Sequence, residues 1–359
     1  MNRTAGLFLA AALLAAPTPA PALAQRDSGT FIVRDFRFTS GEMLPEVQLY
    51  YRTLGRPQRD AAGTVRNAVL ILHGTGGTGA QFFSPLFVPL YRPGGPLDTS
   101  RTFIILPDDV GHGRSSKPSD GLRARFPHYG YQDMVTLEYR LVTEGLHVDH
   151  LRIVMGTSMG CMHSWIWAER YPGFMDGVVP LACVPTQIAG RNRMMRKMIL
   201  EDIRGDPAWR GGDYTEQPPG LAAALQVLFV LTSSAPVQQR AAPTRDSADA
   251  WIIGWLAARR ATTDANDMLY QFDASRDYDP SPDLERITAP LLAINSADDF
   301  VNPPELGLME KLIPRVPRAR YILVPISDVT RGHGTHTVAS AWEQWFAPFV
   351  AGLAPRPSR

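Results

Sequence analysis

The sequence has little cysteine, no excess of charge of either sign and no apolar run long enough to cross a membrane. Its 359 residues include only Cys161 and Cys183, too few to make a metal site by themselves. The 36 basic and 35 acidic residues nearly balance, whereas a nucleic-acid-binding domain usually carries a clustered basic excess. With 45% hydrophobic and 20% charged residues, the composition is that of a folded globular protein, which excludes a mainly disordered chain and a polytopic membrane protein.

Residues 1–24 have the features of an export leader. One basic residue precedes an apolar run over residues 5–16, and Ala22–Ala24 ends the segment with the small residues that signal peptidase accepts. The run is shorter than the roughly 20 residues of a membrane-spanning helix. We expect cleavage between Ala24 and Gln25, a periplasmic or secreted protein, and no membrane span after cleavage.

Export leaves two interpretations of the cysteines open. Cys161 and Cys183 form one disulfide in an oxidising compartment, or they are two small buried apolar side chains.

Short apolar runs and helical patterns alternate along most of the chain. Several runs are continuously apolar, as in strands that are covered on both faces of a parallel sheet. The pattern predicts an α/β fold with a mostly parallel, eight-stranded sheet and helices on both faces. The strand runs are Phe31–Phe38, Val47–Thr53, Ala68–His73, Phe103–Pro107, Leu151–Gly156, Gly177–Ala182, Pro290–Asn295 and Tyr321–Pro325, and the helices between and after them are Tyr131–Leu146, Met159–Tyr171, Glu305–Ile313 and Thr337–Ala351.

One segment breaks this alternation. Residues 185–284 contain no good strand run, although most connections in compact domains are far shorter. We interpret them as a helical lid inserted into a core made of residues 25–184 and 285–359, lying over the sheet edge where ligands bind in open α/β folds. Its tryptophans are either core or cavity-lining side chains, and its predicted helices are Arg193–Ile203, Leu221–Leu231, Ala248–Ala258 and Asp264–Phe272.

The sequence Gly156-Thr157-Ser158-Met159-Gly160 fits the pattern G-x-S-x-G. An apolar strand run precedes it and a helical pattern follows, which is the context in which a sharp turn projects a nucleophilic serine into a cleft. The context therefore indicates that Ser158 is a nucleophile, although the five-residue pattern alone is weak.

A serine nucleophile needs a basic histidine, and the histidine needs an orienting carboxylate. In the fold type with this elbow the chain order is serine, acid, histidine. We expect the base to be His333, in a glycine-flanked loop after the last strand, with His336 as the alternative. We expect the acid to be Asp299, after the preceding strand, with Asp298 as the alternative.

Backbone N–H groups should stabilise the negative oxygen that forms during attack. We expect them from the glycine-rich loop Leu72–Gly77 after the third strand and from Met159, which follows the nucleophile. The loop lacks the Gly-Lys-Ser/Thr ending of a phosphate-binding loop. No third ligand at a recognisable spacing accompanies His333 and His336, so we expect no metal and no cofactor.

Taken together, these motifs resemble the α/β-hydrolase superfamily and, within it, the group similar to homoserine O-acetyltransferases. The resemblance covers nearly all of Phe31–Val350. The superfamily resemblance rests on His73-Gly74, Gly111–Ser115, the elbow, Asp299 with Pro303, and Gly332-His333; the narrower one rests on Tyr131–Val135, the elbow, Asp206–Tyr214 and Asp264–Asn266.

The resemblance implies an α/β-hydrolase fold in which Ser158, Asp299 and His333 match the catalytic triad and Thr75 and Met159 match the oxyanion positions. It also implies an arginine that holds the homoserine carboxylate, for which Arg193, Arg196 and Arg204 are equal candidates in sequence.

Two departures shift our expectation from acyl transfer to hydrolysis. Cys161 stands where the acetyltransferases have a second glycine, and export removes the protein from acetyl-CoA. We therefore expect an exported serine esterase that acts on a small-molecule acyl substrate, with O-acyl transfer from acetyl-CoA to a small alcohol as the alternative. The oligomeric state stays open, a dimer included.

Overall fold

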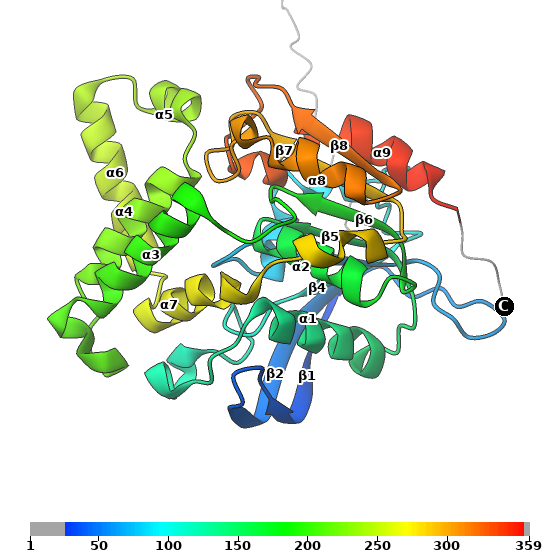
Figure 1. Cartoon of the computed structure of the whole chain (residues 1–359), viewed down its shortest axis with the longest axis horizontal. Coiled ribbons are helices and arrows are strands. Elements are labelled where there is room, and N and C mark those ends of the chain that lie inside the picture. Colours follow the sequence, from blue (N-terminus) through cyan, green and yellow to red (C-terminus); the bar gives the residue numbers. More distant parts are fainter. Residues whose placement is uncertain (1–25, 355–359) are drawn as a thin grey trace, which may run out of the picture.

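The computed structural model describes residues 26–354 as an eight-stranded sheet flanked by helices (Figure 1). The spatial order of the strands is β1-β2-β4-β3-β5-β6-β7-β8. β1 and β2 pair antiparallel, β2 joins β4 antiparallel, and the other pairs are parallel. The strands are Arg26–Arg37 (β1), Met43–Leu54 (β2), Ala68–Leu72 (β3), Phe103–Pro107 (β4), Leu151–Thr157 (β5), Met175–Leu181 (β6), Leu291–Ser296 (β7) and Ala319–Val324 (β8).

The predicted mostly parallel, eight-stranded sheet is thus confirmed. Its central strands are mostly apolar because both faces are covered. Along β3, for example, Leu70 and Leu72 belong to one core cluster and Val69 and Ile71 to the other. This alternation follows from the two-residue period of a strand.

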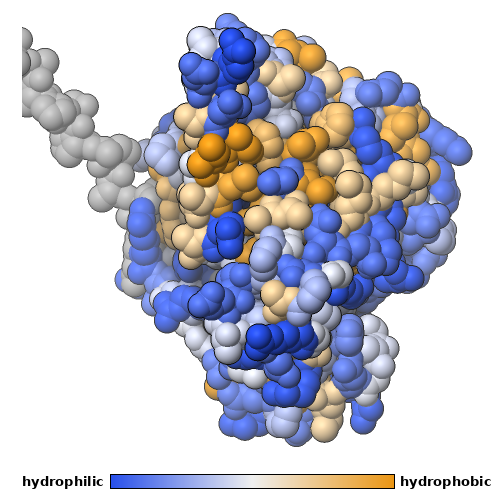
Figure 2. All heavy atoms as spheres, turned by 90° about the vertical axis from the view of Figure 1, so that its left-hand side faces the viewer, coloured by the Kyte–Doolittle hydropathy of each residue, from blue (hydrophilic) through white to orange (hydrophobic). Residues whose placement is uncertain are grey.

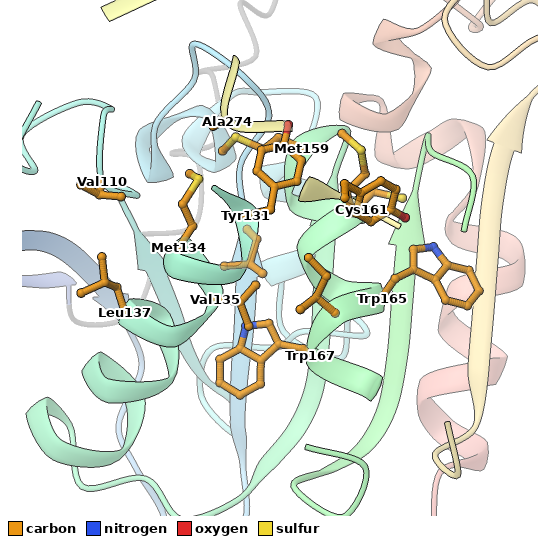
Figure 3. Packing of buried hydrophobic residues seen from close by; sticks show 14 of the residues in the cluster. Val110, Tyr131, Met134, Val135, Leu137, Met159, Cys161, Trp165, Trp167 and Ala274 are labelled. Atoms are coloured by element: carbon orange, nitrogen blue, oxygen red, sulfur yellow. The ribbon is translucent and has the colours of Figure 1, made fainter. Parts of the chain in front are cut away.

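Helices cover the sheet on both faces, as predicted. The first cluster contains side chains of α1 (Tyr131–Arg140) and α2 (Met159–Arg170), and the second contains side chains of α9 (Glu343–Gly352). Trp165 and Trp167 of α2 are fully buried in the first cluster, among apolar side chains of α1 (Figure 3).

Several helix boundaries differ from the prediction, and two helices near the C-terminus differ most. The last helix begins at Glu343 rather than Thr337, because residues 334–341 form short 3₁₀ turns in which the Thr337 hydroxyl bonds the Gly334 carbonyl. The helix predicted over Glu305–Ile313 is reduced to α8, Leu308–Leu312, flanked by 3₁₀ turns. Side-chain bonds to the backbone and prolines both disfavour continued α-helix here.

Within the described residues, no strand lies between β6 and β7. The segment instead contains five helices that gather beside the sheet, on the left in Figure 1. Four were predicted, whereas α5 is short, buries no side chain and left no apolar pattern to find. They are α3 (Gly190–Arg204), α4 (Gly220–Thr232), α5 (Ala235–Ala241), α6 (Arg245–Arg260) and α7 (Ala265–Asp273).

Helix α3 holds this segment together. Its buried residues Arg196, Ile199, Leu200 and Ile203 follow the spacing of one helical face, and α3 packs against both α4 and α7. Trp251 and Trp255 of α6 pack against Phe229 of α4, so these tryptophans contribute to packing between helices.

The outer surface of these helices is partly apolar. Met194, Met198, Val230 and Ile253 are among the large apolar side chains that are exposed. Seen from this side of the molecule, the surface has an apolar patch bordered by hydrophilic side chains (Figure 2).

The predicted leader, residues 1–24, lies outside the described residues. Between residues 26 and 354 no single helix is long and apolar enough to cross a membrane, and only α4 and α5 together, bent by 108° at their junction, reach that length and composition.

Candidate active site

The nucleophile elbow lies between β5 and α2. Ser158 adopts φ 55° and ψ −106°, a conformation that non-glycine residues rarely take. A Cβ atom at Gly156 would collide with the backbone of Gly160, and one at Gly160 would collide with the backbone of Leu72. Both glycines are therefore required for the strand, turn and helix to pack this closely.

The structure brings together Ser158, His333 and Asp299, the three residues expected from the sequence. His333 Nε2 lies 2.8 Å from Ser158 Oγ, and His333 Nδ1 lies 3.0 Å from Asp299 Oδ2. His333 and Asp299 are only 7% and 2% exposed. This arrangement lets the imidazole take a proton from the serine while the carboxylate fixes its orientation.

Asp299 is held as a carboxylate. Burial raises its pKa, but the charge of His333 and hydrogen bonds from His333, Asn302 and the backbone N–H of Val301 outweigh burial and hold the pKa below its usual value. Asn302 was not identified from the sequence, because nothing in the sequence marks a loop asparagine as a partner of the acid.

The alternatives Asp298 and His336 have other contacts. Asp298 accepts hydrogen bonds from the Gly332 backbone N–H at 2.8 Å, from the Ser234 hydroxyl at 3.3 Å and from Ser296. It therefore ties the histidine loop to the start of α5. His336 is half-buried, with its ring centroid 5.2 Å from that of His333, and desolvation followed by the charge of His333 lowers its pKa to about 3.

The two backbone segments expected to stabilise an oxyanion flank the serine. A Cβ atom on Gly74 would lie 3.3 Å from Ser158 Cβ, so the loop that carries Thr75 passes directly beside the nucleophile. Met159 is the first residue of α2, where a backbone N–H has no acceptor within the helix. The Gly160 N–H donates to the His73 carbonyl at 2.9 Å and fixes the two segments relative to each other.

A cavity of about 530 Å³ opens beside Ser158 and His333. Its walls are the loop after β6, the first turns of α3 and the loop after β7, and apolar side chains such as Val184, Ile188 and Leu308 predominate. None of Trp209, Trp251 and Trp255 lines this cavity.

Arg196 is the one arginine of the three candidates that lines this cavity. It is 4% exposed, and it donates to Asn192 Oδ1 at 3.0 Å and to Ser275 Oγ at 3.2 Å. Between residues 26 and 354, no carboxylate lies within 4.0 Å of its guanidinium, whereas Arg204 pairs with Asp273 at 3.3 Å. A buried cation without a carboxylate partner is suited to an anionic ligand group.

Cys161 and Cys183 form a disulfide with Cα atoms 5.9 Å apart. The bond joins the first turn of α2 to Cys183, the second residue after β6, and Cys183 lines the cavity. Of the two interpretations of the cysteines, the disulfide is the one found.

Comparison with known proteins places these features in a family. A family profile described as alpha/beta hydrolase fold matches residues 67–325. A probable acyltransferase from Methanothermobacter thermautotrophicus is 31% identical over 323 residues, which are 90% of this chain and 97% of that protein.

Two further proteins are similar over different extents. A homoserine O-acetyltransferase from Thermobifida fusca is 36% identical over 199 residues, and the match spans 51% of this chain and 50% of that protein. The crystal structure of esterase E22 superimposes with a TM-score of 0.77 at 21% identity, covering 91% of this chain and all of that one (100%), which shows the shared fold.

Proposed function

Because this chain belongs to the alpha/beta hydrolase fold family and to its homoserine O-acetyltransferase-like group, we propose that it transfers acyl groups through an acyl-enzyme on Ser158. The single observation that carries the proposal is the pair of contacts at His333, 2.8 Å to the Ser158 hydroxyl and 3.0 Å to the Asp299 carboxylate. These contacts supply an activated nucleophile and an oriented base.

The reaction follows from this geometry in two halves. Ser158 Oγ attacks the acyl carbonyl carbon while His333 accepts the hydroxyl proton, and the imidazolium then gives this proton to the leaving group. The backbone N–H groups of Thr75 and Met159 bind the negative oxygen, a contribution of about 3–4 kcal/mol for one donor in comparable sites. An acceptor hydroxyl then attacks the ester of Ser158, with His333 again as the base.

For the acceptor we favour a small alcohol that carries a carboxylate. The probable acyltransferase is similar along nearly the whole chain, which supports transfer over the hydrolysis expected from the sequence. Arg196 supports the carboxylate, since it lines the same cavity as Ser158 and has no acidic partner among residues 26–354.

Hydrolysis is the second candidate, and the disulfide favours it. A disulfide is expected in an oxidising compartment, so it supports our proposal that the chain is exported after cleavage between Ala24 and Gln25. Acetyl-CoA is a cytoplasmic donor, and water would accept the acyl group where no such donor exists.

The two candidates are separated by product analysis. The mature protein is mixed with acetyl-CoA or p-nitrophenyl acetate, with and without homoserine, and free acetate and O-acetylhomoserine are measured. Transfer predicts that O-acetylhomoserine forms faster than acetate. Faster release of acetate at saturating homoserine would establish the esterase, and absence of both products with both donors would contradict the proposed function.

Export has a separate test. We expect the protein isolated from its native cell envelope to begin at Gln25 and to contain no free thiol under denaturing conditions. A chain that retains Met1, or that shows two free thiols as isolated, would contradict export.

A further inference from the structure

A buried group of acidic and histidine side chains lies behind the elbow, outside the catalytic cavity. Asp109 follows β4, Glu138 is on α1 and His163 is on α2, and their polar atoms lie within 4.8 Å of one another. They are 2%, 2% and 0% exposed. Val110, Met134 and Trp167, which Figure 3 labels, belong to the buried apolar cluster formed by the same elements.

Hydrogen bonds identify Glu138 as an acceptor on both oxygens. His163 Nδ1 donates to Oε1 at 2.7 Å, and the indole N–H of Trp167 donates to Oε2 at 2.6 Å. Two donors to one carboxyl group stabilise its ionised form. Of the two carboxyl groups in the cluster, Glu138 is therefore the one better placed to carry a negative charge.

Asp109, in contrast, receives no hydrogen bond on either carboxyl oxygen from the described residues. Its Oδ2 lies 3.5 Å from His73 Nε2 and within 4.8 Å of the Glu138 carboxylate. His73 Nε2 already accepts the backbone N–H of Asp109 at 3.0 Å, so this nitrogen carries no hydrogen. A carboxylate in this position would face a lone pair and a second negative charge, whereas a carboxylic acid can donate a hydrogen bond to Glu138.

Between residues 26 and 354, no lysine or arginine forms an ion pair that would neutralise a second negative charge on Asp109 and Glu138. Burial, then the charge of Glu138, raises the pKa of Asp109 to about 8, and burial lowers the pKa values of His112 and His163. Burial also raises the pKa of Glu138 to about 8, although hydrogen bonds from Asp109 and Trp167 and the charge of Arg170 on α2 act to lower it. Asp277 is a further charged group that faces His163.

We propose that Asp109 keeps its proton and shares it with Glu138, and that this buried acid pair positions the catalytic backbone through His73 and His163. His73 precedes Gly74-Thr75, and its carbonyl accepts the Gly160 N–H of the elbow. His163 lies on α2, one turn beyond the Met159 N–H. The pair thus joins both halves of the oxyanion site without contacting substrate, so Asp109 and Glu138 are positioning residues.

The same atoms do not fit a bound metal ion. His163 Nδ1 and Glu138 Oε1 are 2.7 Å apart, which is the length of a direct hydrogen bond. Two ligands at about 2.0–2.1 Å from a tetrahedral zinc ion would be about 3.3 Å apart.

Loss of the shared proton leaves two adjacent buried carboxylates. When hydroxide or buffer removes the proton from Asp109, the repulsion between them separates β4, α1 and α2, and the oxyanion N–H groups move with these elements. The activity should therefore fall on the alkaline side, where Asp109 ionises.

The test is Asp109→Asn, which keeps a hydrogen-bond donor and cannot ionise. Its activity on an activated ester should match that of the wild type at pH 7. The alkaline limb of its profile of activity against pH should lie at least one pH unit higher than that of the wild type. Asp246→Asn on the exposed face of α6 is the matched control and should leave the limb unchanged. An unshifted limb in Asp109→Asn would overturn the proposal.

Two measurements are independent of the proposed enzymatic activity. Between pH 5 and 8, Asp109 is protonated in the folded protein and ionised in the unfolded chain. The thermal stability of the wild type should therefore fall relative to that of Asp109→Asn as the pH rises across this range. The infrared spectrum of the wild type should also lose a protonated carboxyl band between pH 6 and 10. The same band should be present and lost in Glu169→Gln, which removes the acid outside the cluster whose pKa burial also raises to about 8. Absence of that band at pH 6, or one equivalent of zinc bound by the isolated protein, would overturn the proposal even if the variant fails to fold.

Discussion

At the scale of single residues, two adjacent aspartates have different tasks. Asp299 contacts the His333 imidazole and is proposed to orient it, whereas Asp298 ties the Gly332 N–H to Ser234. Asp299→Asn keeps the shape of the side chain but offers His333 an amide that can favour the wrong tautomer. We expect kcat to fall by about 10³–10⁴-fold.

Asp298→Asn is the matched control for that variant. It should reduce kcat by less than about tenfold and lower Tm, because its hydrogen bonds support a loop rather than the proton transfer. Equal losses of kcat in the two variants, measured at saturating substrate, would show that the roles are not divided in this way.

Arg196 gives a second prediction at this scale. Arg196→Lys retains the charge but loses the planar pair of donors, so KM for a carboxylate-bearing acceptor should rise by about tenfold or more. The rate with a neutral ester should change little. Arg193→Lys, which lies outside the cavity lining, should change neither value. A rise in KM for neutral esters as large as that for acidic acceptors would contradict the role of Arg196.

The residue-level chemistry could be predicted in part. Ser158, Asp299 and His333 follow from a local motif and from the order in which they come along the chain. The choice of Arg196 over Arg193 and Arg204 depended on which face of α3 lines the cavity, which the sequence does not show. The cluster of Asp109, Glu138 and His163 joins residues from three elements. Such contacts leave no periodic pattern in the sequence.

At the scale of elements, the disulfide connects the elbow helix to the wall of the cavity. Its cysteines are 22 residues apart, and closing a loop of this length in the unfolded chain corresponds to about 3 kcal/mol of stabilisation. Cys161→Ser with Cys183→Ser should lower the free energy of unfolding by this amount. It should also reduce activity, because α2 carries the Met159 N–H.

Urea denaturation and esterase assays in the same buffer test this prediction. The reduced wild type should behave like the double variant, and the oxidised wild type provides the control. Full activity together with unchanged unfolding in the double variant would show that the bond holds neither the helix nor the wall.

The elements themselves could be predicted where apolar runs mark them. All eight strands were found. Central strands such as β3 and β4 are continuously apolar because both faces are buried, whereas the edge strands β1 and β8 are only partly buried and show shorter apolar runs. The start of α9 was not, because the turns before it depend on hydrogen bonds such as that from Thr337 to Gly334. Helix α5 is only seven residues long and contains one large apolar residue, Val237, so it had no apolar stripe to detect.

At the scale of the whole molecule, the sheet order explains why distant residues meet. Neighbouring parallel strands β3, β5, β6, β7 and β8 present their carboxyl ends at one edge. The Thr75 loop, Ser158, Cys183, Asp299 and His333 all follow these ends, and the helices between β6 and β7 contribute Arg196 to the same cavity. The resulting cavity holds a serine, a histidine and a buried arginine together, and this combination is the basis of the proposed acyl transfer.

The most direct test of this account is to trap the acyl-enzyme. The mature protein is mixed with p-nitrophenyl acetate, quenched in acid within the first turnover, digested and analysed by mass spectrometry. We predict one acetyl group on the peptide that contains Ser158, a burst of p-nitrophenol equal to the enzyme concentration, and neither in Ser158→Ala. An acetyl group on another residue, or full turnover by folded Ser158→Ala, would contradict the central claim.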